Sequence, residues 1–179
     1  MAGNINGLNS LMKKYGAMAK IVVGSNMEKA IGRGAHIVEA QAKLMCPVND
    51  GELRQSIKTD VKTHDGKVTG TVYTNKKYAS YVELGTGPKG EANHAGISPE
   101  ASPSYTQSPW WIHESQIDKD TAEKYHWPYR ETARGRFYQC SGQPASPFMY
   151  PALKNNEKRV TRSVSDYLAR KIREAAGEE

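Results

Sequence analysis

Six of the nine prolines and all three tryptophans of this 179-residue chain fall between residues 91 and 150. The same stretch carries five Lys and Arg against seven Asp and Glu, whereas residues 1–90 carry 13 against seven. Proline interrupts helices and central strands, because it lacks a backbone donor. We therefore expect residues 88–141 to be an insertion between regular elements. The length suits one domain, residues 1–179.

Residues 8–45 show helical periodicity in two runs. Gly24-Ser25-Asn26 separates the runs, because Ser and Asn favour helix N-caps, and Pro47 ends the second run. Gly32 and Gly34 each weaken the second helix by roughly 1 kcal/mol relative to Ala. They either permit the close approach of another backbone or are tolerated defects.

A turn and two strand-like segments follow the helices. Asn49-Asp50-Gly51 is a strong turn signal. Leu53–Lys62 alternates apolar and polar residues, and Val68–Thr74 is rich in β-branched residues, which predicts an antiparallel hairpin turning at His64-Asp65-Gly66. Tyr78–Leu84 fits a strand or a helix, and we favour a short helix that ends at the glycine-rich turn after it.

The rest of the chain completes an α+β prediction. Trp110–His113 and Arg136–Gln139 are candidates for two further strands, joined by a loop. Pro151 fits the first position of a last helix that continues to about residue 175. The predicted fold is therefore α+β, with a small antiparallel β-sheet packed against a long N-terminal helix and a C-terminal helix. Its parts are a helical region (8–45), a hairpin and short helix (52–87), the insertion (88–141), and a C-terminal segment with its helix (147–176).

Reactive chemistry has weak support in the sequence. Cys46 with a histidine could supply a nucleophile and a base, but it ends an apolar helix and is better explained as a core residue. His113, His126 and Cys140, with Glu114 beside them, match no compact zinc spacing, although scattered residues can converge in space. No phosphate-binding glycine motif occurs. We therefore expect no catalytic, cofactor-binding or metal-ligating residues. A zinc- or cysteine-dependent hydrolase stays as an alternative of a different class.

The net charge of +6 favours an acidic partner such as nucleic acid. Its basic residues are scattered singly, as at Lys58, Lys62 and Lys67, and no recognition motif accompanies them. Three interpretations stay open: a solvated basic face, a DNA-binding protein, and a protein that lies near packaged DNA without reading it.

Three features that are absent from the sequence indicate where the protein is made. No apolar run reaches the roughly 18 residues of a membrane helix. Residues 1–4 do not resemble the start of a signal peptide, and two cysteines cannot make a disulfide scaffold. We therefore expect no membrane partner and synthesis in a reducing cytoplasm.

Three separated signatures stand out. They are CPVNDGELRQSI at residues 46–57, YASYVELGTG at residues 78–87 and GQPASPFMYPAL at residues 142–153. In this order, flanked by helices, they resemble a family of tail components of long-tailed bacteriophages, small neck proteins often called tail completion or head-to-tail joining proteins. The motif residues are Pro47, Gly51, Leu53, Ser56, Tyr78, Ala79, Gly85, Thr86, Pro147, Phe148, Pro151 and Ala152.

Three positions, in two of the signatures, depart from the family pattern. Asn49-Asp50-Gly51 stands where the family usually has Asp-Thr-Gly, and Asn49 keeps the turn. Leu84 stands where an aromatic residue is common, and it keeps an apolar side chain.

The resemblance implies a non-enzymatic virion protein, made in the bacterial host cytoplasm. It implies a ring, with a hexamer as the expected form, that links the phage connector or stopper to the tail terminator or tube, close to DNA in the channel. A tail terminator or minor tail protein is the alternative within this class.

Candidate contact residues follow from residue type and position. Arg54 is expected on the solvent face of its strand and Glu83 just before a turn. We hypothesise that they pair within one subunit or across a ring interface, with two independent surface charges as the alternative. Phe148 and Met149 are expected to form an apolar plug that docks the last helix. Aromatic residues dominate interface hot spots, so partner contact is expected at Trp110, Trp111, Trp127 and Tyr129.

Overall fold

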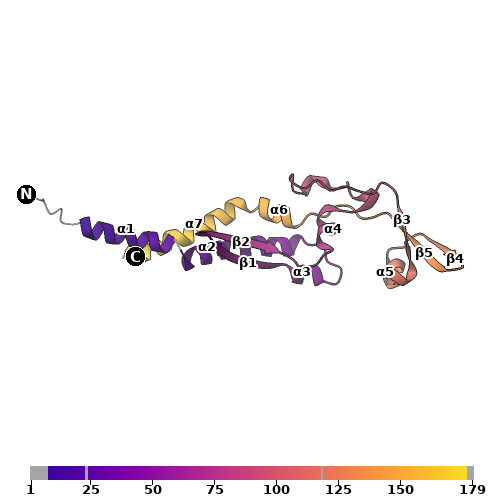
Figure 1. The fold of residues 1–179 in the computed structure, drawn as a ribbon, viewed down its shortest axis with the longest axis horizontal. Helices are drawn as coiled ribbons and strands as arrows, with labels where there is room; N and C mark the ends of the chain where they lie inside the picture. The colour runs from indigo at the N-terminus through magenta and orange to yellow at the C-terminus, as the bar shows by residue number, and fades with distance from the viewer. Residues whose placement is uncertain (1–7, 23, 118, 177–179) are drawn as a thin grey trace, which may run out of the picture. The chain divides into compact units, whose positions relative to one another are not determined.

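The computed structural model describes residues 8–22, 24–117 and 119–176 (Figure 1). The chain divides into two compact units. The scaffold unit comprises residues 1–75 and 152–179, and the insert unit comprises residues 76–151. The insert unit contains the whole predicted insertion and the second signature. The α+β prediction is confirmed, and the described residues hold two small antiparallel sheets rather than one.

The scaffold unit begins with two helices, as predicted. They are α1 (Leu8–Val22) and α2 (Ser25–Met45). Gly24 separates them with a φ of 90°, a backbone conformation that favours glycine. The break therefore comes from Gly24 itself, which caps α2 without a side-chain hydrogen bond.

The predicted hairpin is also present. Strand β1 (Lys58–His64) pairs antiparallel with β2 (Lys67–Tyr73), in a register that runs from Lys58 opposite Tyr73 to His64 opposite Lys67. The two-residue turn between them has a positive φ at both Asp65 (49°) and Gly66 (75°). This is the backbone twist that suits tight hairpins.

The predicted start of the first strand is wrong. Residues Glu52–Ser56 form a short helix, α3, before β1 begins. A carboxylate oxygen of Asp50 accepts the N–H of Glu52 at 3.0 Å, and Gly51 adopts the left-handed conformation. Leu53 and Ile57 are both buried. Their four-residue spacing serves one helical turn as well as it serves alternation, so the pattern alone could not decide.

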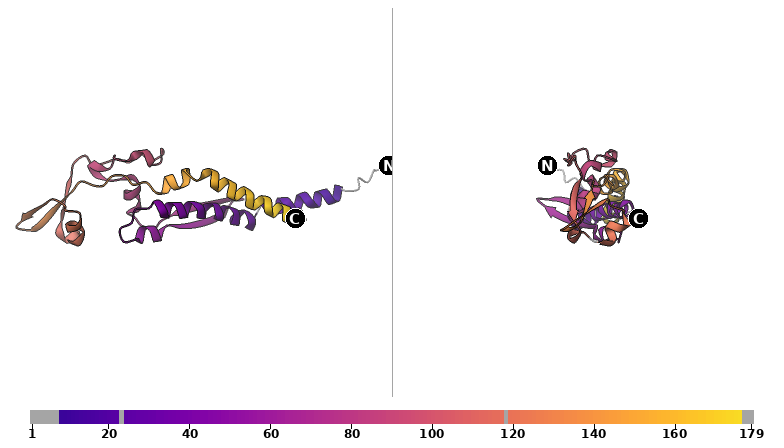
Figure 2. Two further views of the ribbon diagram at one scale, coloured as in Figure 1. Left: turned by 180° about the vertical axis from the view of Figure 1, so that it is seen from behind. Right: turned by 90° about the vertical axis from the view of Figure 1, so that its right-hand side faces the viewer.

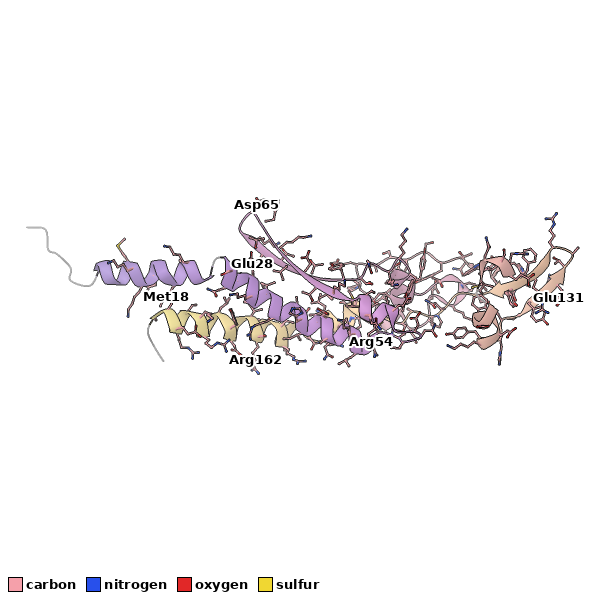
Figure 3. The ribbon with its side chains drawn as sticks, turned by 90° about the horizontal axis from the view of Figure 1, so that it is seen from below. Met18, Glu28, Arg54, Asp65, Glu131 and Arg162 are labelled. Atoms are coloured by element: carbon pink, nitrogen blue, oxygen red, sulfur yellow. The ribbon has the colours of Figure 1, made fainter. Side chains whose placement is uncertain are left out.

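Helix α2 lies between the hairpin and α7 (Glu157–Ala176), as Figures 2 and 3 show. Its buried residues are small: Ala30, Gly34, Ala35, Val38 and Ala42. A Cβ placed on Gly34 would lie 2.9 Å from Cγ1 of Val160, so a larger residue would push α7 away. Gly34 therefore permits the close approach of α7, whose Val160 side chain packs against it. A Cβ on Gly32 would meet Val61 only at an ordinary 3.6 Å.

The insert unit opens with α4 (Ala79–Leu84), the short helix favoured from sequence. Both predicted strands exist, as β3 (Trp110–His113) and β5 (Gly135–Cys140). They belong to a sheet of order β3-β5-β4, and beside it α5 (Lys119–Lys124) lies in the predicted loop (Figure 1). Strand β4 (Tyr129–Thr132) was missed because all four of its residues are exposed, so no apolar alternation marks it. Short 3₁₀ turns cover Gly87–Lys89, His94–Gly96 and Glu114–Gln116.

The C-terminal helix is interrupted, contrary to the prediction of one continuous helix. Helix α6 (Met149–Lys154) ends where the side-chain amide of Asn156 donates to the carbonyl of Ala152 at 2.8 Å. Pro151 is the third residue of α6 rather than its first. No helix among the residues described by the structure is both long and apolar enough to span a membrane.

Candidate functional site

Glu83 joins the second signature to the third inside the insert unit. Its carboxylate accepts three backbone N–H groups: from Phe148 at 2.7 Å, Met149 at 2.9 Å and Tyr150 at 3.0 Å. These belong to the residue before α6 and to the first two residues of the helix. A negative group at a helix N-terminus also meets the positive end of the helix dipole. Glu83 therefore caps α6 from a distant part of the sequence.

Pro151 completes this cap. The first four N–H groups of a helix have no partner within the helix. In α6 three of them bond to Glu83, and the fourth position is a proline, which has no N–H. Phe148 beside the cap is fully buried, at 0% exposure. Arg54 lies exposed on α3, and its pairing with Glu83 stays a prediction.

Backbone bonds hold the two signatures together elsewhere. Thr86 and Gln143 form an antiparallel bridge, with N–H to carbonyl distances of 2.9 and 3.1 Å. Gly142 has a φ of 74°, and a Cβ there would collide with the carbonyl of Thr86. The N–H of Ser146 bonds to the carbonyl of Val82 at 2.8 Å. These positions explain why the signatures contain glycine where the two segments meet.

Tyr105 fixes the loop that follows α4. Its hydroxyl donates to the carbonyl of Leu84 at 2.6 Å, and the His94 ring nitrogen lies 2.5 Å from that hydroxyl. Burial, with a smaller contribution from the charge of Glu91, raises the pKa of Tyr105. The loop is thus held by one hydrogen bond to the backbone of α4 and by one contact between side chains.

The predicted aromatic contact residues do not form one patch. In an antiparallel sheet, residues directly opposite each other share a face, and neighbours along a strand alternate. Trp110 therefore shares a face with Ile112, which lies in one row with Tyr138 and Tyr129. Trp111 lies on the other face. The insert sheet thus presents aromatic groups on both sides.

Each face pairs an arginine with an exposed aromatic ring. The Arg130 guanidinium lies 4.8 Å from the Trp111 ring centroid, and Arg136 lies 5.0 Å from that of Tyr129. Trp111 is 39% exposed and Tyr129 is 54% exposed. Stacked arginine and aromatic groups are a composition typical of interfaces. Neither arginine was predicted as a contact residue. Arg130 directly follows Tyr129 in the sequence, which was a signal, whereas Arg136 comes near Tyr129 only through the pairing of β4 with β5.

Trp110, at 36% exposure, and Trp127 also make packing contacts within the insert unit. A Cβ on Gly87 would lie 2.7 Å from the Trp110 ring, so that ring packs on the turn of the second signature. Trp127 is half-buried and lines a groove of about 700 Å³ with His126 and Cys140. These two rings contribute to the packing of the insert unit.

The candidate metal ligands are used in local contacts. The two ring nitrogens of His113 lie 2.8 Å from the Ser115 hydroxyl and 2.8 Å from the Arg134 carbonyl. His126 bonds to a carbonyl of its own turn at 2.7 Å. Within residues 8–22, 24–117 and 119–176, no three His, Cys, Asp or Glu side chains gather as a metal site would require. Cys46 is 3% exposed, in agreement with its expected core position.

A polar cluster in the scaffold unit centres on Glu39. Lys43 donates to it at 2.6 Å, the Thr59 hydroxyl donates at 2.6 Å, and the His36 ring lies 3.1 Å away. Burial acts to raise the pKa of Glu39, but these hydrogen bonds and the Lys43 charge outweigh it and lower the pKa to about 2. The cluster ties β1 to α2.

The two units differ in charge. The scaffold unit carries 17 Lys and Arg against 11 Asp and Glu, whereas the insert unit carries eight of each. The entire net charge of +6 therefore belongs to the scaffold unit. Charged and aromatic surfaces, rather than a cluster of reactive side chains, are what the described residues present.

Comparison with known protein families gives a match over the N-terminal part of the chain. Residues 9–85 match the family model described as "Bacteriophage HK97-gp10, putative tail-component". The match contains the whole first signature and most of the second, and it confirms the resemblance to phage tail components. A structural phage tail component is thus the class that the match supports. No curated protein and no solved structure matches the chain.

Proposed function

We propose that the protein is a structural component of the phage neck, a tail-completion ring that joins the connector or stopper to the tail terminator or tube. The observation that carries the proposal is the match of residues 9–85 to a tail-component family. The protein acts by binding alone, without catalysis. It is made in the host cytoplasm and ends in the virion.

Two unlike units support a joining role. A joining protein contacts one assembly on each side, and it needs surfaces of different chemistry to tell them apart. The scaffold unit is basic, and the insert unit is neutral with exposed Trp111 and Tyr129. We assign partner contact to the arginine and aromatic pairs of the insert sheet.

The ring is part of the same proposal. Head-to-tail contacts between identical subunits close into a ring when the rotation between neighbours is right. We expect a hexamer, with exposed Arg54 on α3 at the subunit interface. Reversing the charge of Arg54 should then impair ring assembly, which negative-stain microscopy or mass photometry of the isolated necks can measure.

The test is a phage with a stop codon in place of Lys20, grown in a host without a suppressor. Electron microscopy of the lysate should show filled heads beside separate tails of normal length. Plasmid-borne wild-type protein should restore joined particles, which controls for effects on neighbouring genes. Overlong tails would move the assignment to a tail terminator. Intact, infectious virions would overturn a structural role.

A further inference from the structure

Four arginines line a groove on the helical side of the scaffold unit. The groove has a volume of about 360 Å³ and lies between α2, which supplies Arg33, and α7. From α7 come Arg159, Arg162 and Arg170, with Asp166 as the one acidic residue of the lining. Figure 3 shows Arg162 on the side of α7 away from the hairpin turn at Asp65.

Few acidic groups compensate the charge of these four arginines, which share one groove lining. Among the described residues, Arg33, Arg159 and Arg162 form no ion pair, and Arg170 reaches Glu174 only at 3.9 Å. Arg33 and Arg170 share one ring, lying 4.8 and 5.5 Å from the centroid of Tyr167. Gathering like charges costs electrostatic free energy, which an anion in the groove would offset.

The groove suits an extended anion. Arg159 and Arg170 are 11 residues apart on one helix, which corresponds to about 16 Å at 1.5 Å per residue. That length spans about five nucleotide steps of one DNA strand, at 3.4 Å per step. Guanidinium groups match phosphate oxygens in planar, bidentate geometry.

The lining argues against an acidic protein as the occupant. The core of a protein interface is depleted in charge and contains accessible apolar anchors. Here the apolar lining is Ile37 and Tyr167, and Tyr167 is only 7% exposed beneath its two arginines. Nucleic-acid interfaces are instead polar and strongly positive. We propose that the α2–α7 groove binds the phosphodiester backbone of DNA without sequence preference. This goes beyond the joining role and does not rest on it.

The test measures binding of the full chain to a fluorescently labelled DNA duplex by anisotropy, as salt is raised. The variant replaces Arg33, Arg159 and Arg162 by Gln. Each phosphate contact contributes about 0.9 to the slope of log affinity against log salt. The slope should fall by about 3, and binding at low salt should weaken by at least about tenfold.

Two further variants keep the test decisive. Replacing Lys13, Lys58 and Lys67 by Gln removes the same charge from exposed sites away from the groove lining and should leave most of the binding intact. Replacing the three groove arginines by Lys should also retain binding, which separates lost charge from misfolding.

Three results would overturn the proposal. They are no DNA binding by the wild-type protein at low salt, equal losses in the groove and control variants, and competition by poly-glutamate as effective as competition by unlabelled DNA. The last result would assign the groove to an acidic protein segment instead. An unchanged joining phenotype in the groove variant would leave the neck role standing.

Discussion

The scaffold unit and the insert unit are held together by different means. In the scaffold unit, α2 packs between the hairpin and α7 through small residues, so side-chain volume sets the spacing. In the insert unit, segments far apart in sequence meet through backbone bonds, as between Thr86 and Gln143, and through the Glu83 cap. One unit should therefore be sensitive to volume, and the other to the loss of a polar partner.

The two units also differ in their surfaces. All of the net charge lies in the scaffold unit, while the insert unit is neutral and exposes stacked rings. A neutral surface avoids long-range repulsion or attraction, and its specificity then depends on shape and stacking. Substitutions in each unit test this difference.

Replacing Glu83 by Ala should have the largest effect on the stability of the protein. The change leaves three N–H groups at the start of α6 without their carboxylate, at a cost of about 2–4 kcal/mol. Amide hydrogen exchange should accelerate at Phe148, Met149 and Tyr150, while the hairpin amides of the scaffold unit remain protected. The Glu100→Ala variant is the control, because Glu100 is exposed. Unchanged protection at the three amides would show that the cap does not stabilise α6.

Added side-chain volume should destabilise the scaffold unit at Gly34 but not at Gly32. Gly34→Val forces a side chain against Val160 and should destabilise the protein by about 1–3 kcal/mol. Gly32→Ala is the matched change in the same helix, and it should stabilise by up to about 1 kcal/mol through helix propensity. Urea unfolding measures both. Effects of the same sign would contradict the close packing of α2 on α7.

Acid should weaken the scaffold unit through Glu39. Its pKa is about 2 in the folded protein against 4.5 as the ordinary value. A lowered carboxyl pKa gives stability that is present above pH 4.5 and lost as pH falls toward 2. We expect a loss on the order of 1–2 kcal/mol, allowing for solvent screening of the cluster. Glu39→Gln should flatten this part of the stability curve measured by urea unfolding. An equally steep curve would assign the acid sensitivity to other carboxyls.

Elements with their own periodicity could be predicted from the sequence. The two N-terminal helices, the hairpin, the short helix at Ala79–Leu84 and strands β3 and β5 all follow from spacing and turn residues. The start of the first strand was mispredicted because the four-residue spacing of Leu53 and Ile57 fits both a helical turn and strand alternation. The continuous C-terminal helix was wrong because the side chain of Asn156 ends α6, a local contact with no periodic signal.

The site was less predictable because its contacts join distant residues. Glu83 was predicted to pair with Arg54, and that pairing stays a prediction. The observed partners of Glu83 are backbone groups 65 to 67 positions away. The arginine groove combines α2 and α7, so single basic residues in the sequence did not reveal it. The alternation of Trp110 and Trp111 did imply opposite faces once a strand was assumed.

The smallest effect on folding should come from the exposed rings of the insert sheet. Trp111 and Tyr129 keep 39% and 54% exposure, so replacing both by Ala should cost only about 1 kcal/mol of stability. Complementation of the stop-codon phage should nevertheless fall strongly, because buried aromatic anchors carry most of an interface's energy. Tyr73→Ala, a change at a similarly exposed ring (42%) in the scaffold hairpin, is the control. Full complementation by the double variant would move partner contact away from the insert sheet and toward the scaffold unit.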